Sequence, residues 1–163
     1  MVLGRDETLV GRVRTLRQYD EPDAPDQAFN YKMTDIQAAL GLCQVARLES
    51  FLARRRTIAA RYHEDVRQAG LTPPLAPPGL EHGYFRYVLR LSGPAGPALD
   101  RAHKLEIGCQ RPVRLPIHRY LGLSGFPETD AAWERALSIP LYPALTDHEV
   151  ERVVSALPAI LAG

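Results

Sequence analysis

Hydrophobic residues repeat at helical spacing from about residue 34 to residue 70. The first part of this segment is apolar on two nearly opposite sides, with Ile36, Ala39, Leu40, Cys43 and Ala46 on one side and Val45, Leu48 and Leu52 on the other. A helix that is apolar on two sides is typical of a segment buried between two layers. After Glu49 the sequence becomes charged, and a single apolar stripe continues to a stop at Gly70. This change favours a break or kink near 49–51.

Four further helices are predicted by their ends and their apolar spacing. Asp6 can cap a helix that reaches Leu16, and Pro97 stands near the first position of another. The segment TDAAWERALSIPLYP predicts a short helix that runs into extended chain. A capping box, Thr146-Asp147-His148-Glu149, begins the last helix. Pro158 should end or kink this helix. The expected buried stripe before it consists of Val150, Val153, Val154 and Leu157.

Alternation of apolar and polar residues predicts two strands. The first is YFRYVLRL (84–91), a half-buried strand. Its apolar face consists of Phe85, Tyr87, Leu89 and Leu91. The second is CQRPVRL (109–115), in which Pro112 favours an edge position or a bulge because proline cannot donate a ladder hydrogen bond.

The remaining segments predict connections. The acidic, proline-bearing segment 20–28 predicts a loop, and the four prolines of 71–80 predict a stiff extended connection. The apolar run at 1–4 is typical of the end of a strand. The resulting order is β-α-α-β-α-β-α-α, which predicts an α/β (α+β) fold with a short sheet flanked by long helices on one side.

Composition narrows the function classes. The chain has 163 residues, 45% hydrophobic and 24% charged, as in an ordinary one-domain protein, and no apolar run approaches the length of a membrane span. A net charge of +1 gives no electrostatic case for nucleic acid or an anionic membrane, so neither is expected as a partner. Cys43 and Cys109 lack the spacing of a metal or redox motif, and we expect two buried thiols in a cytoplasmic protein.

The sequence lacks the motifs of most metal-binding, nucleotide-binding and nucleophilic sites. The five histidines are scattered without metal-ligand spacing, and no phosphate-binding loop, dinucleotide motif or nucleophile elbow is present. Arg54, Arg55 and Arg56 could contact phosphate, but consecutive residues on a helix point in different directions, so we expect a solvated face.

Two segments retain functional potential. Asn30 and Lys32 stand just ahead of a helix and could hold an anionic oxygen, although Asn30 could equally belong to a turn before a Thr34 cap. In RPVRLPIHRY (111–120), prolines fix the backbone from which polar side chains project towards an anionic ligand such as a sugar phosphate, or simply towards solvent. These side chains are Arg111, Arg114, His118 and Arg119.

The same segments resemble a known family. FNYKMTDIQAALGLCQVARLESFLARRRTIAARY resembles the corresponding segment of the DegT/DnrJ/EryC1/StrS aminotransferases, pyridoxal-phosphate enzymes that mostly act on nucleotide-linked keto sugars. MVLGRDETLVGRVRTLRQYD, HGYFRYVLRL, IGCQRPVRLPIHRYLGL and ALSIPLYPALTDHEVERVVSAL resemble further motifs of that family in register. The resemblance implies the small C-terminal domain of the fold-type I aminotransferase architecture. Residues 1–28 would end the large-domain part, 29–70 would form an interface helix region, and 71–163 would form the small α/β domain.

The resemblance also implies roles for individual residues. Asn30 would contact the phosphate of pyridoxal 5'-phosphate in the neighbouring subunit of a dimer, and the helix behind it would be packed against both subunits. His118 would line the substrate pocket, with Lys32 and Arg111 near it. Lys32 replaces an arginine of the family motif, and Gly-Tyr-Phe at 83–85 stands where Ser-Tyr-His is frequent.

In the family, the lysine that binds the cofactor lies upstream of the first matching motif, before this chain begins. Lys32 and Lys104 are the only lysines, and neither matches it. We therefore expect no catalytic residue in this chain, no transamination by this polypeptide alone and no cofactor bound by it alone. Its partner would be a second copy or a chain that carries the catalytic half, with a nucleotide sugar as substrate. The alternative is a free-standing, non-catalytic binding or dimerisation domain derived from the family.

Overall fold

The chain divides into two compact units, Met1–Arg47 and Leu48–Gly163. The structure is a computed structural model that describes residues 4–17 and 29–162. Residues 1–3 of the expected strand end and all of the expected loop at 20–28 lie outside these ranges. The three-part division implied by the family resemblance has boundaries at 28 and 70, whereas the two compact units meet at Arg47.

The first unit contains two capped helices, α1 (Glu7–Leu16) and α2 (Asp35–Ala46). The Asp6 carboxylate accepts hydrogen bonds from the first-turn N–H groups of α1, which confirms the predicted cap. At α2, Thr34 accepts from the Gln37 N–H at 3.3 Å, and the Gln37 side chain accepts from the Thr34 N–H at 3.0 Å. This reciprocal capping box stabilises the start of α2 without any tertiary contact.

The expected burial of α2 is wrong for the isolated chain. No residue of α2 is buried, and Ile36 is 76% exposed. Leu40, Leu42 and Val45 are 62–73% exposed. Two apolar stripes can be buried only if protein lies against both sides of a helix. The described residues of the first unit do not supply that cover.

The second unit begins with α3 (Leu48–Gln68), which follows α2 after a single non-helical residue, Arg47. The predicted break is therefore present but lies two residues before Glu49. One stripe of α3 is buried, with Ile58, Ala59, Tyr62 and Val66 at 1% exposure or less. Gly70, at φ +74°, turns the chain away from the helix end, as its lack of a Cβ permits.

The sheet has two antiparallel strands, β1 (Tyr87–Arg90) and β2 (Ala136–Ile139), with Tyr87 opposite Ile139. Only the second half of the predicted strand 84–91 forms, because Tyr84 adopts a φ of +42° and turns the backbone. Phe85 is consequently 77% exposed instead of sharing the buried face of Tyr87.

The predicted strand at 109–115 is wrong. Only Gln110 pairs with the sheet, through a single antiparallel bridge to Ser138. Pro112 follows two residues later and has no N–H to continue the ladder. The second strand is instead β2, within the segment expected to be a helix followed by extended chain.

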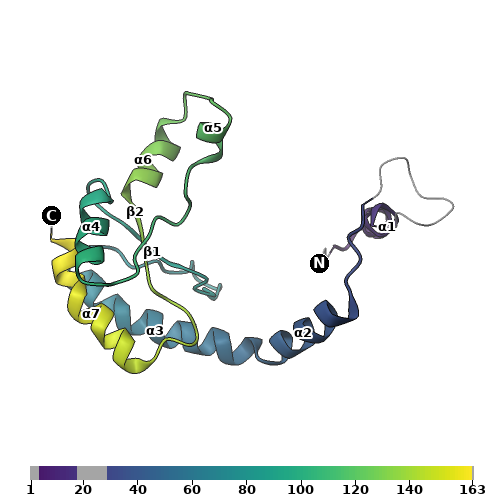
Figure 1. The fold of residues 1–163 in the computed structure, drawn as a ribbon, viewed down its shortest axis with the longest axis horizontal. Helices are drawn as coiled ribbons and strands as arrows, with labels where there is room; N and C mark the ends of the chain where they lie inside the picture. The colour runs from purple at the N-terminus through teal and green to yellow at the C-terminus, as the bar shows by residue number, and fades with distance from the viewer. Residues whose placement is uncertain (1–3, 18–28, 163) are drawn as a thin grey trace. The chain divides into compact units, whose positions relative to one another are not determined.

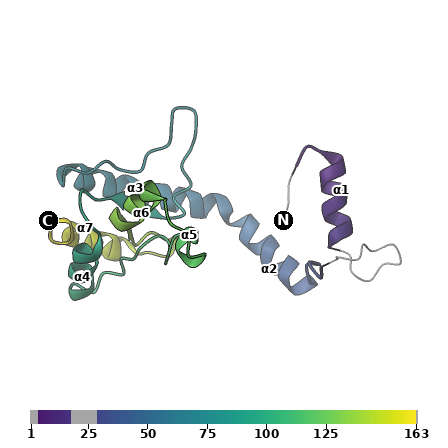
Figure 2. The same ribbon diagram turned by 90° about the horizontal axis from the view of Figure 1, so that it is seen from above.

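The core of the second unit lies where α3, α4 (Gly96–Lys104) and α7 (Asp147–Leu161) meet the two strands. Figure 2 shows α7 between α3 and α4, and it shows the 71–86 segment as a long loop between α3 and β1. The predicted stripe of α7 is buried and extends to Ile160, and Pro158 lies inside the helix instead of ending it. The observed fold is thus α+β, with a short sheet flanked by long helices.

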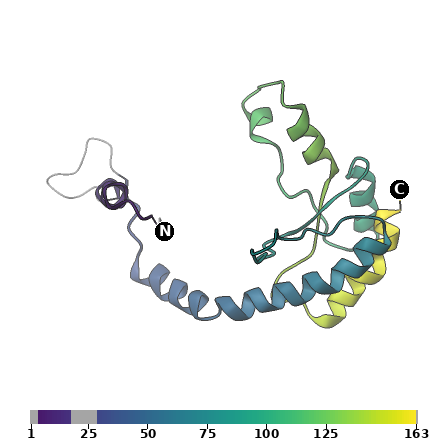
Figure 3. The ribbon, with the colours of Figure 1, turned by 180° about the vertical axis from the view of Figure 1, so that it is seen from behind.

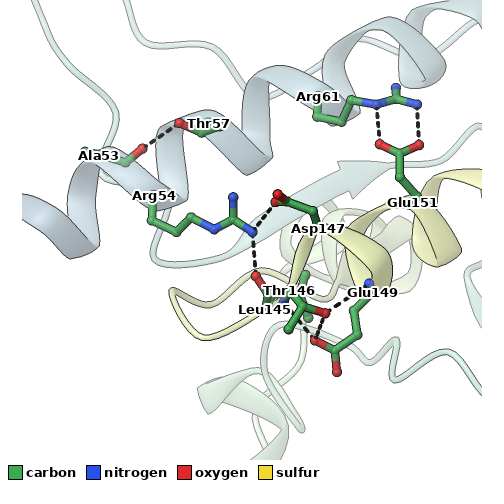
Figure 4. A network of polar contacts seen from close by, with 9 residues as sticks. All are labelled: Ala53, Arg54, Thr57, Arg61, Leu145, Thr146, Asp147, Glu149 and Glu151. Atoms are coloured by element: carbon green, nitrogen blue, oxygen red, sulfur yellow. Dashed lines mark hydrogen bonds and ion pairs between the residues drawn. The ribbon is translucent and has the colours of Figure 1, made fainter.

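The three consecutive arginines of α3 do not form the solvated face expected from the sequence. Arg54 donates to the carbonyl of Leu145 at 2.6 Å and pairs with Asp147 at 2.8 Å. About two turns further along, Arg61 binds both carboxylate oxygens of Glu151, at 2.8 and 2.9 Å. Figure 4 shows how these contacts join α3 to the start of α7.

Arg55 and Arg56 bind the end of the loop that precedes β1. Arg55 donates from Nη1 to the carbonyls of Tyr84 and Phe85, at 2.9 and 3.0 Å. Arg56 pairs with Glu81 at 2.6 Å. Consecutive helical residues point in different directions, as expected, but each direction is occupied by another chain segment. These arginines are partly buried structural contacts.

Replacing either of two buried tyrosines with phenylalanine should have different effects on the free energy of unfolding. The Tyr62 hydroxyl donates to the carbonyl of Pro140 at 2.9 Å, whereas the buried Tyr87 hydroxyl has no hydrogen-bond partner among the described residues. Tyr62→Phe should lower the free energy of unfolding by about 1–3 kcal/mol, because a partly buried carbonyl loses its donor. Tyr87→Phe should leave it unchanged or raise it. Urea unfolding followed by circular dichroism measures both, and equal destabilisation by the two variants would contradict this assignment.

Acid should weaken both the start of α7 and its ion pair with α3. Hydrogen bonds from Thr146 lower the pKa of Glu149, and the hydrogen bond from Arg61 lowers the pKa of Glu151, both from an ordinary value of 4.5. The resulting stabilisation is fully present above the unfolded-state pKa and is lost as the pH falls through the lowered folded-state pKa values. We expect the Glu149→Gln, Glu151→Gln variant to lose less stability than the wild type between pH 7 and about pH 3 in urea unfolding. Glu128→Gln, on the exposed first turn of α6, should retain the wild-type pH dependence.

Within residues 4–17 and 29–162, no helix combines the length and the apolar character that crossing a bilayer requires.

Candidate functional site

An arm formed by residues 111–135 carries the candidate site. It contains α5 (Ile117–Tyr120) and α6 (Pro127–Arg135), and β2 follows α6 without a connecting loop. Figures 1 and 3 show the arm extending from the sheet of the second unit. Because the arm is continuous with β2, its side chains have a fixed point of attachment to the core.

The arm surrounds an open pocket of about 610 Å³. Its polar side chains are His118, Thr129 and Trp133. The other lining residues are apolar: Pro112, Val113, Pro116, Ile117, Leu121, Leu123, Phe126, Ala132 and Ala136. The indole N–H of Trp133 already donates to the carbonyl of Val113 at 3.1 Å. An apolar pocket with few polar groups is the usual form of a small-molecule site.

His118 is buried, at 8% exposure, and its ring is held from two sides. Its Nε2 lies 3.0 Å from Oδ1 of Asp130, on α6. The ring of Phe126 lies against it, with ring centres 4.9 Å apart. The structure therefore places the expected pocket histidine at a pocket and gives it one carboxylate partner.

Asp130 has a second partner on the same oxygen. Arg119 donates from Nε to Oδ1 at 2.7 Å, so one carboxylate joins two neighbouring residues of α5 to α6. Desolvation acts to raise the pKa of Asp130, but the hydrogen bonds from Arg119 and His118 outweigh it, and the pKa lies below its usual value. Asp130 is therefore ionised at neutral pH.

Arg111 stabilises the end of α6. Its Nη1 donates to the carbonyls of Trp133 and Glu134, at 2.7 and 2.9 Å. Its guanidinium lies 4.2 Å from the centre of the Trp133 ring, and that of Arg119 lies 4.7 Å from it. Arg111 thus belongs to the same arm as His118, as expected, but it does not line the pocket. Both guanidinium groups are held in place by the arm itself.

Asn30 and Lys32 lie in the first unit, in the exposed segment before α2. The flanking rings of Phe29 and Tyr31 are stacked, with centres 5.1 Å apart. The carboxamide of an exposed asparagine can donate to a phosphate oxygen, so Asn30 fits the role that the resemblance implies. The start of α2 is a weaker anion site than the sequence suggested, because Thr34 already occupies the Gln37 N–H and Asp35 adds a negative charge.

Asp130 and Trp133 were not identified as site residues from the sequence. Asp130 lies 12 residues after His118, beyond a loop, and no helical or strand periodicity relates the two positions. Only the fold of the arm brings them together. No sequence pattern marks Trp133 as a site residue either, because its role depends on the contacts of its ring with Arg111 and Arg119.

The cysteines and the acidic residues provide no competing site. Cys43 is exposed, which corrects the expectation of two buried thiols, and burial raises the pKa of the partly buried Cys109 to about 11. A raised pKa keeps a thiol protonated and unreactive at neutral pH. In the described part of the chain, no three His, Cys, Asp or Glu side chains gather in a way that could hold a metal ion.

Known proteins are similar to this chain in sequence and in fold. GDP-perosamine synthase of Caulobacter vibrioides is 30% identical over 99% of this chain and 47% of its own length. The spore coat polysaccharide biosynthesis protein SpsC of Bacillus subtilis is 33% identical over 89% of this chain and 40% of its own. The aminotransferase TlmJ of Streptoalloteichus hindustanus superposes with a TM-score of 0.82 and 28% identity, covering 97% of this chain and 46% of TlmJ.

The chain thus spans less than half the length of the curated relatives it matches. The family model of the DegT/DnrJ/EryC1/StrS aminotransferases matches residues 1–158, which include α1, α2 and the arm with its pocket. The sequence motifs, the α+β fold and this nearly complete match agree, and the chain belongs to the DegT/DnrJ/EryC1/StrS aminotransferase family.

Proposed function

We propose that this chain forms the C-terminal portion of a pyridoxal-phosphate-dependent aminotransferase that aminates a nucleotide-linked keto sugar. The family match over residues 1–158 carries this proposal. The similarity to GDP-perosamine synthase and to SpsC, a polysaccharide biosynthesis protein, supports a sugar as substrate. The activity is proposed for the assembled enzyme, since the chain spans less than half of these relatives.

Pyridoxal phosphate supplies the electron sink for amino transfer when it is bound. Asn30 is the residue of this chain that we assign to the cofactor. Its exposed carboxamide would donate a hydrogen bond to a phosphate oxygen of the cofactor in the neighbouring subunit. The exposed apolar surface of α2, just behind Asn30, supports a subunit interface at this position.

His118 is the residue that we assign to the substrate. It is buried, lines the apolar pocket of the arm and is held by Asp130. Lys32 and Arg111 would lie near the substrate. Arg111 would contribute mainly by fixing the end of α6, because its Nη1 is already bound to two backbone carbonyls.

Neither lysine is suited to hold the cofactor covalently. Lys104 is exposed on α4, and Lys32 lies in the exposed segment before α2. Neither lines the pocket of the arm. We therefore propose that the 163-residue chain is inactive alone and acts in a homo-oligomer or with a partner chain that carries the catalytic half.

The test is to isolate the native protein that contains this chain, by adding an affinity tag to the chromosomal gene that encodes it. We expect the purified material to show the visible absorbance of protein-bound pyridoxal phosphate and to transfer an amino group from an amino acid to a nucleotide-linked keto sugar. The 163-residue chain expressed alone should show neither property. Native material that lacks bound cofactor and activity would overturn the proposal and favour a non-catalytic binding or dimerisation domain.

A further inference from the structure

We propose that Asp130 is a positioning residue that holds the His118 ring so that its Nδ1 accepts a hydrogen bond from a hydroxyl group of the sugar substrate. The inference rests on the proposed function for the identity of the ligand. The orientation of the ring rests on the geometry of the arm alone. It assigns to His118 a chemistry different from the phosphate binding that the basic segment 111–120 suggested.

The carboxylate decides which ring nitrogen carries the proton. Asp130 is ionised at neutral pH, because its pKa lies below the usual value, and an ionised carboxylate can only accept hydrogen bonds. Nε2 of His118 lies 3.0 Å from Oδ1 of Asp130, so Nε2 must be the donor. In a neutral imidazole the other nitrogen, Nδ1, then has no proton and is an acceptor.

Arg119 fixes the carboxylate from a second direction. Its Nε donates to the same Oδ1 at 2.7 Å, so Asp130 is held by Arg119 as well as by His118. This second hydrogen bond keeps Oδ1 in place as the acceptor for the Nε2–H group, and Nδ1 is the ring nitrogen that remains for a ligand.

The composition of the pocket makes Nδ1 of His118 selective for a hydroxyl group over a phosphate oxygen. The only hydrogen bond that the described residues make with the His118 side chain is the one to Asp130, which leaves Nδ1 for a ligand. Apart from the Thr129 hydroxyl, no other side chain that lines the pocket offers an unused polar group. A ligand O–H can satisfy Nδ1, whereas a phosphate oxygen only accepts and would leave two acceptors facing each other. A sugar hydroxyl therefore fits this pocket, and the phosphate groups of the substrate do not.

The test compares Asp130→Asn with Glu128→Gln, a control on the same helix whose side chain is exposed. Nitrogen-15 NMR of the histidine rings in the 163-residue chain reports the tautomer of His118. We expect the Nε2–H form in the wild type and in the control, and a mixture of both neutral forms in Asp130→Asn, since a carboxamide can either donate or accept. Asp130→Glu should restore most of the Nε2–H form.

The native enzyme supplies the second readout. For Asp130→Asn we expect the KM for the nucleotide-linked sugar to rise about 10-fold, the loss of one hydrogen bond, with a smaller change in kcat. The control should match the wild type in both constants. A wild-type His118 with its proton on Nδ1, or charged at neutral pH, would overturn the inference, as would an unchanged tautomer and KM in Asp130→Asn. If the native protein had no aminotransferase activity, the sugar contact would fail together with the proposed function. The tautomer would still decide whether Asp130 positions the ring.

Discussion

Replacing Leu157 with alanine is expected to lower the free energy of unfolding of the Leu48–Gly163 unit by about 2–5 kcal/mol. Leu157 is completely buried on α7, inside the core that α3, α4 and the two strands share. Its truncation removes apolar contact and leaves a cavity that the surrounding elements can fill only in part. Such a loss is a large fraction of the stability of a typical domain. Urea unfolding followed by far-ultraviolet circular dichroism measures it.

The matched control is Leu80→Ala. Leu80 is 67% exposed in the loop between α3 and β1, so the same chemical change should alter the free energy of unfolding by less than about 0.5 kcal/mol. Comparable destabilisation by the two variants would show that Leu157 does not belong to the core. A loss of stability confined to the first unit would also contradict this prediction, because α7 packs within the second unit.

Introducing two charges into α2 should dissolve the self-association that we expect of this chain. Ile36 and Leu40 lie one turn apart on one apolar stripe and are 76% and 62% exposed. Burying each against a second subunit would contribute about 1.5–3 kcal/mol, so Ile36→Glu together with Leu40→Glu should weaken association by about 100-fold or more. Light scattering over a range of protein concentrations measures the change in molecular mass.

Gln44→Glu is the control for charge on the same helix, because Gln44 belongs to neither apolar stripe of α2. It should associate like the wild type. The capping box at Thr34 remains intact in both variants, so the helix content by circular dichroism should not change. A wild-type chain that stayed monomeric at every concentration would contradict the proposed interface.

The sequence alone was sufficient where a structural feature depends on residues close together in the chain. The caps at Asp6, Thr34 and Thr146 were predicted correctly because each side chain bonds to a backbone N–H two or three residues away. The buried stripe of α7 followed from its spacing. The family was likewise identifiable, since its motifs are continuous segments such as NYKMTDIQAALGL.

Predictions failed where distant segments decide the outcome. The three arginines of α3 were expected in solvent, yet Arg54 binds a carbonyl 91 residues away and Arg55 binds one 29 residues away. The strand at 84–91 is shortened by the positive φ of Tyr84, at a position where Arg55 binds its carbonyl. No local pattern encodes such contacts, because they depend on where other parts of the chain have folded.

The features of the candidate site also fall into those that local sequence predicts and those that depend on distant contacts. The sequence by itself determined the family and the helix caps, since each depends on local spacing or on a continuous motif, and the family motif led to the prediction that His118 lines the substrate pocket. Only the tertiary structure joined His118 to Asp130 and Arg119, and placed the two arginines on Trp133. The physical reason is that these bonds cross the loop between α5 and α6, so their geometry exists only after both helices have been placed by β2 and the core.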